Sequence, residues 1–478
     1  MGTSSDNQAK ELRLYFCKYK QEHVFKFWEI LSEQERANLI YQAKALDLEY
    51  LSAVINNALH RNHSKDTSFA PISPAKFIKY PNSVVDWQKW KDTIELGENI
   101  IRAGKVAAFT AAGGEGTRLG YSVPKGMLSV TPIKHKSLFQ IFAEKIRYAE
   151  HKYDVRIPWI VMTSEQTHNE TIEFFGKNDS FGVEDLHFIK QGQMPAISYD
   201  GKIIMETRSR IAMHPDGHGG SLKALGRSGM LAMLEERGIE ILSFFQVDNP
   251  LVRCIDPYLI GLHVQNKAQV SSRMVKKLYP EEKVGIFCEQ NGRCRVIEYT
   301  DLPREQAVMR DSSGNLVFCS GNIGVHLLDV RFMKQFNGKN IKSEISYHIA
   351  KKVIPTIDNF GECVTQQSPN GLKLEMFIFD AFPRAEKTII VESKRLSNFS
   401  PIKNREGLDS MKTCLHDQLK LCVKWLQAAG ADIPSDANGV PPFDVEISPL
   451  FADNKYDFVD KWSKLQTKPV IAAGQYIE

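Results

Sequence analysis

Residues able to bind phosphate lie close together between positions 106 and 130. A glycine-rich turn supplies Gly113 and Gly114, and the cations Arg118 and Lys125 follow within a dozen residues. Glycine has no Cβ atom, so backbone N–H groups of such a turn can approach an anion closely. Guanidinium and ammonium groups neutralise the charge of that anion. The stretch therefore predicts a cradle for a polyphosphate.

The spacing excludes two better-known glycine loops. A P-loop ends in Gly-Lys-Ser/Thr, whereas this loop continues as Gly116-Thr117-Arg118. A dinucleotide fingerprint needs a third glycine three residues after its second, and here it comes one residue late, at Gly120. A tight turn without a ligand is the simpler alternative. The accompanying cations argue against that alternative.

The residues around the loop predict the elements that position it. Residues 106–112 are small, apolar or β-branched, which is typical of a strand buried on both faces of a parallel sheet. Similar apolar runs occur at 159–162, 186–189 and 241–247, and helical patterns lie between them at 137–148 and 165–175. This alternation predicts an α/β fold with a mixed, mainly parallel sheet. Such sheets bind ligands beyond the carboxyl ends of their strands.

The apolar run 241–247 leads directly into an acid, Asp248. Mg²⁺ prefers carboxylate oxygen, keeps several waters and bridges phosphate oxygens, so an acid at a strand end suits it. A strand-end aspartate alone is more often a turn or cap residue. The glycine loop in the same chain favours the metal.

Composition bounds the possible functions. The chain has 478 residues, of which 42% are apolar and 25% charged, and its net charge is only +4. These values are typical of a globular protein of two or three domains, and they argue against a nucleic-acid partner. The eight cysteines form no C-x-x-C pair, and no signal peptide or long apolar run is evident. We expect a cytoplasmic protein without a membrane partner.

Pattern changes along the chain predict three domains. Residues 1–97 form an N-terminal helical region, with a capping box at Ser32 to Glu35. Residues 98–384 form the catalytic domain, including one helix over 221–237. Residues 385–478 form a small C-terminal lobe, with a strand at 388–392 and a helix at 410–429.

The residues from Gly113 to Met127 resemble the signature of the UDP-sugar pyrophosphorylases, especially the branch that acts on N-acetylglucosamine. Further matches are the Val-Asp-Asn at 247–249, the QG-x-x-P segment at 191–195 and the FSPIKN loop at 399–404. That branch usually has glutamine where this chain has Glu115. The resemblance implies a Rossmann-like nucleotidyltransferase core, and it covers the chain to about Pro449.

The resemblance also implies roles for residues that the pattern alone would leave unassigned. Lys403 would join Arg118 and Lys125 as a catalytic cation, with Gly113 and Gly114 on the nucleotide and Asp248 on Mg²⁺ (or Mn²⁺). The substrate-binding residues would be Gln191 at the uracil edge, Gly217 and His218 at the uracil and sugar, Gly285, Glu298 and Asn322 at the sugar hydroxyls and amide, and Phe377 and Phe379 at the acetyl methyl.

One residue departs from the N-acetylglucosamine branch. That branch usually has asparagine at the position of His218, whereas the UDP-glucose branch has histidine in a Gly-His-Gly-Asp loop. A UDP-glucose or broad-specificity pyrophosphorylase is therefore an alternative. A non-catalytic nucleotide-sugar-binding regulator is a further alternative, opposed by the joint presence of Arg118, Lys125, Asp248 and Lys403.

The resemblance as a whole implies uridylyl transfer from UTP to N-acetylglucosamine-1-phosphate by in-line displacement, with no covalent enzyme intermediate. The partners expected are UTP and the sugar-1-phosphate, or the UDP-sugar and pyrophosphate in reverse. The protein is expected to be a monomer or weak homo-oligomer. Because Lys403 falls in the predicted C-terminal lobe, that lobe is expected to close during the reaction.

Overall fold

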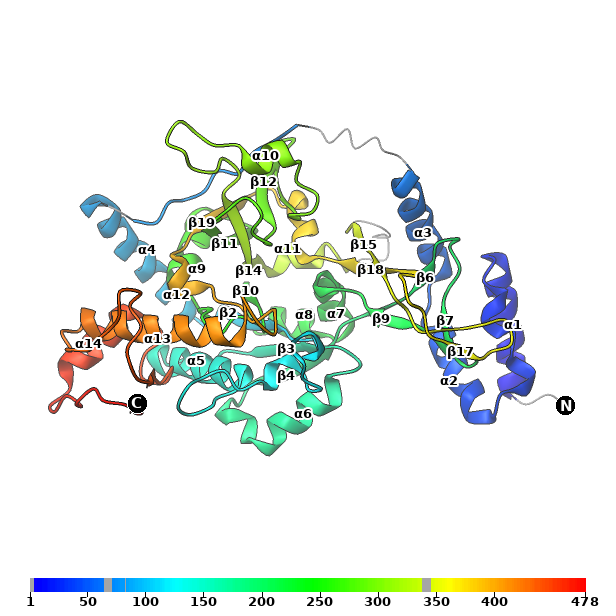
Figure 1. Ribbon diagram of the computed structural model, residues 1–478, viewed down its shortest axis with the longest axis horizontal. Helices are drawn as coiled ribbons and strands as arrows, with labels where there is room; N and C mark the ends of the chain where they lie inside the picture. Colours follow the sequence, from blue (N-terminus) through cyan, green and yellow to red (C-terminus); the bar gives the residue numbers. More distant parts are fainter. Residues whose placement is uncertain (1–3, 64–70, 82, 338–344) are drawn as a thin grey trace. The chain divides into compact units, whose positions relative to one another are not determined.

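The computed structural model describes residues 4–63, 71–81, 83–337 and 345–478 (Figure 1). Its contacts divide the chain into two compact units, each assembled from separate stretches of sequence. Unit 1 comprises residues 1–69, 191–223 and 336–381, and unit 2 comprises residues 70–190, 224–335 and 382–478. These boundaries differ from the predicted ones at 97 and 384. The reason is that both units take segments from the middle of the chain.

Unit 2 is built on one large mixed sheet. Its main order is β1-β12-β14-β10-β2-β3-β4, with β13 beside β12, β11 beside β14, and β19 beside β11. The strands are β1 (Ile72–Pro74), β2 (Val106–Ala111), β3 (Trp159–Thr163), β4 (Leu186–Lys190), β10 (Ile241–Gln246), β11 (Val270–Lys276), β12 (Ile286–Gln290), β13 (Arg293–Ile297), β14 (Ser320–Asp329) and β19 (Thr388–Glu392). The four strands predicted from apolar runs, β2, β3, β4 and β10, are confirmed.

Parallel pairing is confined to two parts of this sheet. Strands β10, β2, β3 and β4 run parallel to one another, and β11 is parallel to β19. The pairings of β14 with β10, β11 and β12 are antiparallel, as are those of β12 with β1 and β13. The parallel part brings the carboxyl ends of β2 and β10 to one edge, because Ala111 pairs with Gln246.

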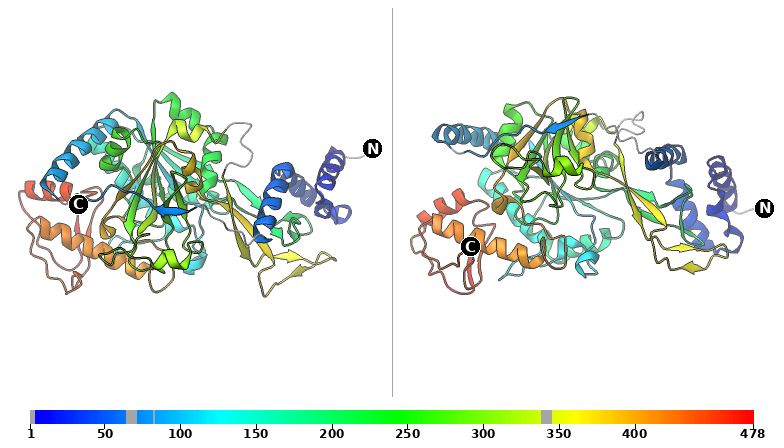
Figure 2. Two further views of the ribbon diagram at one scale, coloured as in Figure 1. Left: turned by 90° about the horizontal axis from the view of Figure 1, so that it is seen from above. Right: turned by 45° about the horizontal axis from the view of Figure 1, so that its top comes forward.

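Helices cover both faces of this sheet (Figure 2). The helices of unit 2 include α4 (Val84–Arg102), α5 (Leu138–Tyr153), α6 (His168–Lys177), α8 (Met230–Glu236), α9 (Pro257–Gln265), α11 (Val330–Lys334), α12 (Arg395–Asn398), α13 (Met411–Ala428) and α14 (Lys455–Lys464). Helices α4 and α9 cross at glycines. A Cβ on Gly97 would lie 1.8 Å from the Pro257 carbonyl oxygen, and one on Gly261 would lie 1.9 Å from that of Thr93. Only glycine permits this close packing.

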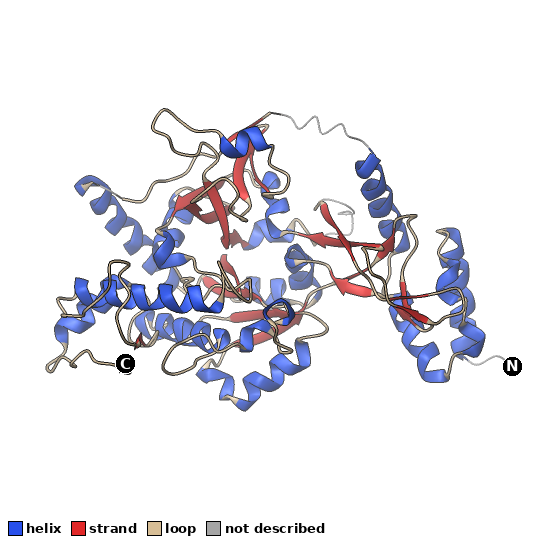
Figure 3. Cartoon of the chain, viewed as in Figure 1, coloured by secondary structure: helices blue, strands red, loops and turns tan. Residues whose placement is uncertain are grey.

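Unit 1 combines helices with short strands (Figure 3). Its helices are α1 (Ser4–Lys18), α2 (Glu33–Lys44) and α3 (Leu48–His63), and the capping box predicted at Ser32 to Glu35 is confirmed. A three-stranded sheet has the order β15 (Tyr347–Lys352), β18 (Gly371–Met376), β6 (Ile197–Ser198). Buried Leu39 and Leu51 share one core with Ile197 and Leu374. The N-terminal helices therefore belong with later segments.

The C-terminal segment is part of unit 2. Strand β19, predicted within a small lobe, pairs instead with β11 in the large sheet. Helix α13 is confirmed, and β20 (Val445–Ile447) pairs with β21 (Gln475–Ile477). The prediction of one helix over 221–237 is wrong, because α7 (Ser221–Arg227) ends before Gly229, where φ is +78° and α8 begins anew. Within the described residues, none of the helices has the length and apolarity needed to span a membrane.

Candidate functional site

The glycine loop folds back on itself directly after β2. Gly116 donates its N–H to the Val123 carbonyl over 3.0 Å, and Lys125 donates to the Gly114 carbonyl over 3.1 Å. A Cβ on Gly116 would lie 2.9 Å from the Val123 oxygen, so this position requires glycine, whereas Gly114 is exposed with open space around it. The loop thus has a fixed outline and an uncovered backbone at Gly114. This is the form that the phosphate cradle requires.

Two of the predicted residues meet where β2 and β10 end. The Lys125 ammonium lies 4.0 Å from Asp248 Oδ2, and both side chains are largely buried, at 17% and 14% exposure. This separation is an ion pair without a hydrogen bond. Arg118, on the short helix Thr117–Leu119, is exposed and has no hydrogen bond or ion pair to a described residue. Glu115 is exposed too.

The Lys403 segment is attached to the end of β10. Ile402 donates its N–H to the Asp248 carbonyl over 2.8 Å. The buried amide of Asn249 donates to the Asn398 carbonyl over 2.7 Å and accepts from the Ser400 N–H over 3.1 Å. Residues 398–402 therefore already lie against the end of β10. Closure of a separate lobe is not needed to bring the Lys403 backbone there.

Lys403 lies beside Asp409. The backbone N–H groups of Lys403 and Asn404 donate to the Asp409 carbonyl over 2.7 and 3.0 Å. Burial raises the pKa of the Asp409 carboxyl, while the nearby Lys403 ammonium acts in the opposite direction. The Lys403 ammonium itself lies 5.5 Å from the Phe399 ring centroid. Among the described residues it has no carboxylate within ion-pair distance, so its charge remains available to a ligand.

The residues predicted to read the sugar hydroxyls lie together in unit 2. Asn322 donates its N–H to the Gly285 carbonyl over 2.8 Å. Glu298 Oε1 would be 3.2 Å from a Cβ placed on Gly285, so glycine leaves room beside this carboxylate. The Asn322 side-chain oxygen accepts the Gly324 N–H over 2.9 Å. The group offers a carboxylate acceptor and an amide donor on adjacent strand ends.

The residues predicted to hold the sugar and acetyl group lie together in unit 1. Gly217 has φ +86°, and a Cβ there would lie 2.3 Å from the Met376 carbonyl oxygen. His218 Nδ1 accepts the Ile378 N–H over 3.2 Å, and its ring stacks on Phe377 with centroids 5.2 Å apart. Phe379 lies 5.2 Å from Phe377. The Nδ1 contact requires a lone pair there, so a neutral His218 carries its proton on Nε2.

The predicted uracil reader, Gln191, is partly buried beside the same loop. Its neighbour Gly192 accepts the Asp216 N–H over 3.0 Å, and Asp216 in turn accepts the Met376 N–H over 2.7 Å. These bonds tie the QG-x-x-P segment, the His218 loop and the Phe377 segment into one group within unit 1. The assigned roles of all these residues stay predictions.

Sequence reasoning missed three residues that organise these groups. His348 stacks on Phe377 with centroids 4.2 Å apart, and its Nε2 lies 2.8 Å from Asp380 Oδ2, which also accepts the Phe377 N–H. Asn249 is the third. Asn249 lies in the Val-Asp-Asn motif at 247–249 and Asp380 directly follows Phe379, so both had a signal in the sequence, whereas His348 has none nearby.

The Mg²⁺ prediction rests on Asp248 alone. Among the described residues, no three or more His, Cys, Asp or Glu side chains gather into a group suited to a metal. A single carboxylate is still a sufficient protein ligand for Mg²⁺ when substrate phosphates and waters complete the octahedron. The position of Asp248 beside the glycine loop fits that mode of binding.

Comparison with known proteins gives consistent findings. The profile of the family described as UTP--glucose-1-phosphate uridylyltransferase matches residues 49–422. Human UDP-N-acetylhexosamine pyrophosphorylase-like protein 1 is 35% identical over 471 residues, 92% of each chain. UDP-N-acetylglucosamine diphosphorylase 2 of Arabidopsis thaliana is 36% identical over 472 residues, 94% of this chain and 90% of the relative. The crystal structure of the Trypanosoma brucei UDP-N-acetylglucosamine pyrophosphorylase with an inhibitor is 28% identical, with TM-score 0.83, and covers 100% of this chain and 99% of that chain.

Proposed function

Because this chain belongs to the UTP--glucose-1-phosphate uridylyltransferase family, we propose that it transfers the uridylyl group of UTP to N-acetylglucosamine-1-phosphate. The products are UDP-N-acetylglucosamine and pyrophosphate. The observation that carries the proposal is the meeting of the glycine loop, Asp248 and the Lys403 segment at the carboxyl ends of β2 and β10. The names of relatives matched over nine-tenths of the chain support the N-acetyl sugar.

The chemistry is an in-line displacement. A phosphate oxygen of the sugar-1-phosphate attacks the α-phosphorus of UTP, and the bond from that phosphorus to the pyrophosphate oxygen breaks. The attacking phosphate is already anionic near neutral pH, so no general base is assigned. Positioning and neutralisation of charge provide the acceleration in such reactions.

The residues of unit 2 provide that neutralisation. The backbone at Gly113 and at the exposed Gly114 binds nucleotide phosphates. Arg118 and Lys125 stabilise the triphosphate and the departing pyrophosphate, and Lys403 binds the sugar phosphate. Asp248 would hold Mg²⁺ (or Mn²⁺). When bound, that ion neutralises phosphate oxygens.

His218 supports a second candidate, a UDP-glucose or broad-specificity enzyme. The stacked His218 and Phe377 rings and the adjacent Phe379 form an apolar surface. Such a surface suits an acetyl methyl, whereas glucose presents a hydroxyl at that position. We therefore favour the N-acetyl sugar.

We also propose a cytoplasmic enzyme that is a monomer or weak homo-oligomer and has no nucleic-acid or membrane partner. The near-neutral charge supports the absence of a polyanion partner. The eight cysteines are free in the structure, which suits a reducing compartment.

A panel of sugar-1-phosphates tests the proposal. Pyrophosphate release from UTP and Mg²⁺ is measured with N-acetylglucosamine-, N-acetylgalactosamine- and glucose-1-phosphate. We expect the highest kcat/KM with an N-acetyl sugar. An equal kcat/KM with glucose-1-phosphate would favour the second candidate, a UDP-glucose or broad-specificity enzyme. No pyrophosphate release with any sugar would refute the proposal that the protein is a pyrophosphorylase.

A further inference from the structure

A cavity of about 430 Å³ lies inside unit 2, apart from the residues assigned to the reaction. Residues 251–258, 393–398, 421–428 and 453–456 contribute to its lining. None of Arg118, Lys125, Asp248 and Lys403 is among them. Its volume falls within the range of small-molecule sites.

Aromatic side chains form much of the wall. Trp90 lies 5.7 Å from Tyr258 and 5.0 Å from Tyr456, measured between ring centroids. Tyr80 and Trp425 complete the aromatic lining. Rings grouped around a cavity offer faces and edges on which a planar ring can stack.

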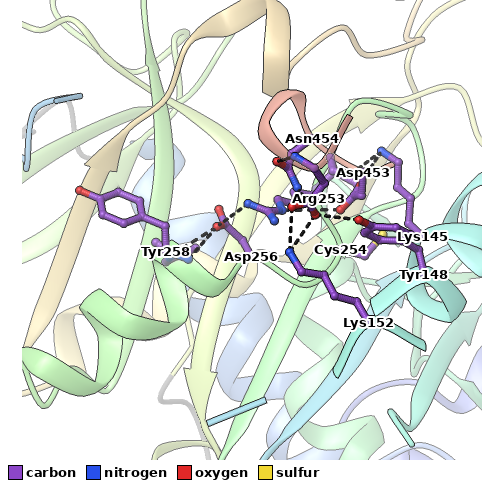
Figure 4. A network of polar contacts seen from close by, with 12 residues as sticks. Lys145, Tyr148, Lys152, Arg253, Cys254, Asp256, Tyr258, Asp453 and Asn454 are labelled. Atoms are coloured by element: carbon purple, nitrogen blue, oxygen red, sulfur yellow. Dashed lines mark hydrogen bonds and ion pairs between the residues drawn. The ribbon is translucent and has the colours of Figure 1, made fainter. Parts of the chain in front are cut away.

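Arg253, whose side chain is 20% exposed, belongs to the lining of the same cavity and lies between the carboxylates of Asp256 and Asp453 (Figure 4). Arg253 Nη1 and Nε lie 3.6 Å from Asp256 Oδ1 and Asp453 Oδ2, which is beyond hydrogen-bond distance. Its Nε is buried and has no hydrogen-bond partner among the described residues. Arg273, by contrast, donates from Nε to Asp256 Oδ2 over 3.0 Å. The hydroxyl of Ser393, also in the lining, is buried too, and no described residue forms a hydrogen bond with it.

The charge of the lining is positive. Five cations face two carboxylates, Asp256 and Asp453, an excess of three positive charges. The excess comes from exposed lysines: Lys394 lies 4.6 Å above Tyr80, Lys455 lies 4.9 Å above Tyr456, and Lys424 completes the set. Unused buried donors, a cationic rim and aromatic walls together match a ligand that carries both a ring and an anionic group.

We propose that this cavity is a second ligand site, which binds an aromatic compound bearing a phosphate or similar anion. The ring stacks among Trp90, Tyr258 and Trp425, and the anion accepts hydrogen bonds from Arg253 and Ser393. The occupant also contacts α12, because Ser397 and Asn398 belong to the lining. Asn398 is held by Asn249, so the ligand adjoins the segment that leads to Lys403.

Burial raises the pKa of Asp453 to about 6, with Lys145 and Arg253 opposing and Asp457 and Asp256 reinforcing that rise. Tyr148 also faces this group through its bond to Asp457. The Asp453 charge is therefore easily neutralised, which lowers its repulsion of an anion. We expect an anion of constant charge, such as a sulfonate, to bind more tightly at pH 5.5 than at pH 7.5.

The test uses 1-anilinonaphthalene-8-sulfonate, an aromatic anion whose fluorescence rises on binding, with phenyl phosphate as competitor. The intact protein is titrated with and without saturating UTP. We expect one probe molecule to bind per chain. Phenyl phosphate should displace this probe, and UTP should not. A probe displaced by UTP, or no saturable binding, would overturn the proposal.

Variants locate the bound probe. Lys394→Ala combined with Lys424→Ala removes two exposed charges without touching the core, and should weaken binding roughly tenfold. Arg253→Lys keeps the positive charge but loses the planar set of guanidinium N–H donors, and it should weaken binding of the probe further. Lys412→Ala, an exposed lysine outside the lining, is the control. Unchanged affinity in the double variant, with an unchanged circular dichroism spectrum, would place the probe elsewhere and refute the site.

Discussion

Two kinds of cation in unit 2 differ in how fully they are paired. Lys136 is buried, with a side-chain exposure of 4%, and donates over 2.6 Å both to Glu144 and to the Tyr476 hydroxyl. Lys125 approaches a carboxylate only to 4.0 Å, and Arg118 and Lys403 have none within ion-pair distance among the described residues. A fully paired cation stabilises the fold. The open cations, Arg118, Lys125 and Lys403, keep hydrogen-bond donors for a substrate.

The pKa of Lys136 illustrates the paired case. Burial acts to lower it, but the hydrogen bonds that the ammonium donates to Glu144 and Tyr476 prevail and leave the pKa raised. The bond to Tyr476 joins the C-terminal strand β21 to the segment that follows the glycine loop. Pairing of this kind holds the loop in place. The open cations are thereby positioned although they form no hydrogen bond to a carboxylate.

The largest effect on activity is expected from Arg118→Ala. Removing an exposed charge that stabilises the transition state should lower kcat about 10²-fold or more. The melting temperature should hardly change, since no hydrogen bond or ion pair to a described residue is lost. Steady-state rates and thermal unfolding check both parts. Arg304→Ala, an exposed arginine on α10 (Arg304–Val308), serves as control. Near-normal turnover would exclude Arg118 from the chemistry.

Lys403→Ala should lower kcat by roughly 10- to 10²-fold while leaving UTP affinity nearly unchanged, because its charge is assigned to the sugar phosphate. Calorimetric titration of UTP beside steady-state rates tests this, with Lys412→Ala as control. A variant that loses UTP affinity tenfold yet turns over normally at saturation would make Lys403 a nucleotide-binding residue.

Asn249→Ala sharpens the comparison, since Asn249 positions an open cation without being one. The change leaves the Ser400 N–H and the Asn398 carbonyl without their partner, and should destabilise the fold by about 1–3 kcal/mol. It should also lower kcat about tenfold, because the Lys403 segment loosens. Asn249→Asp keeps the acceptor for Ser400 and should recover part of the activity. Equal loss in both variants would argue against a positioning role.

The effect expected at Asp453 is on stability and not on turnover. Its native pKa of about 6 lies above the ordinary value of 3.8, so the native carboxyl binds a proton more readily than the unfolded one. The stability from this group is present in full below pH 3.8 and is lost as pH rises to 6, by about 3 kcal/mol. The melting temperature of the wild type relative to Asp453→Asn should therefore fall between pH 4 and pH 7. A constant difference would contradict the raised pKa.

The sequence predicted those features that depend on neighbours along the chain. The buried pattern of residues 106–112 and 241–247 located β2 and β10, and the acid after β10 placed Asp248 beside the glycine loop. The resemblance named Gly285 with Asn322 for the sugar hydroxyls and amide, and these two residues are hydrogen-bonded to each other, although their roles stay predictions. The interruption between α7 and α8 at Gly229 was not predicted. A single glycine within a run of helically spaced apolar residues does not reveal that its φ is positive.

Features that depend on long-range pairing were not predictable. Strand β19 has an ordinary apolar alternation, and nothing local indicates that it joins the large sheet through β11. The two-unit division depends on a core in which Leu39 and Leu51 lie with Ile197 and Leu374, more than a hundred residues away in the sequence. The two hydrogen bonds of Asn249 to Asn398 and Ser400 likewise join residues that are far apart in the sequence.

One paired measurement tests the distinction between open and paired cations most directly. Lys125→Met and Lys136→Met remove the same charge from the same stretch of chain, and kcat and the free energy of unfolding are measured for both. Lys125→Met should lose turnover about 10²-fold and keep its stability, whereas Lys136→Met should lose about 3–5 kcal/mol, because Glu144 is left buried and unpaired. A Lys125→Met enzyme with normal turnover, or a Lys136→Met protein of unchanged stability, would contradict the distinction.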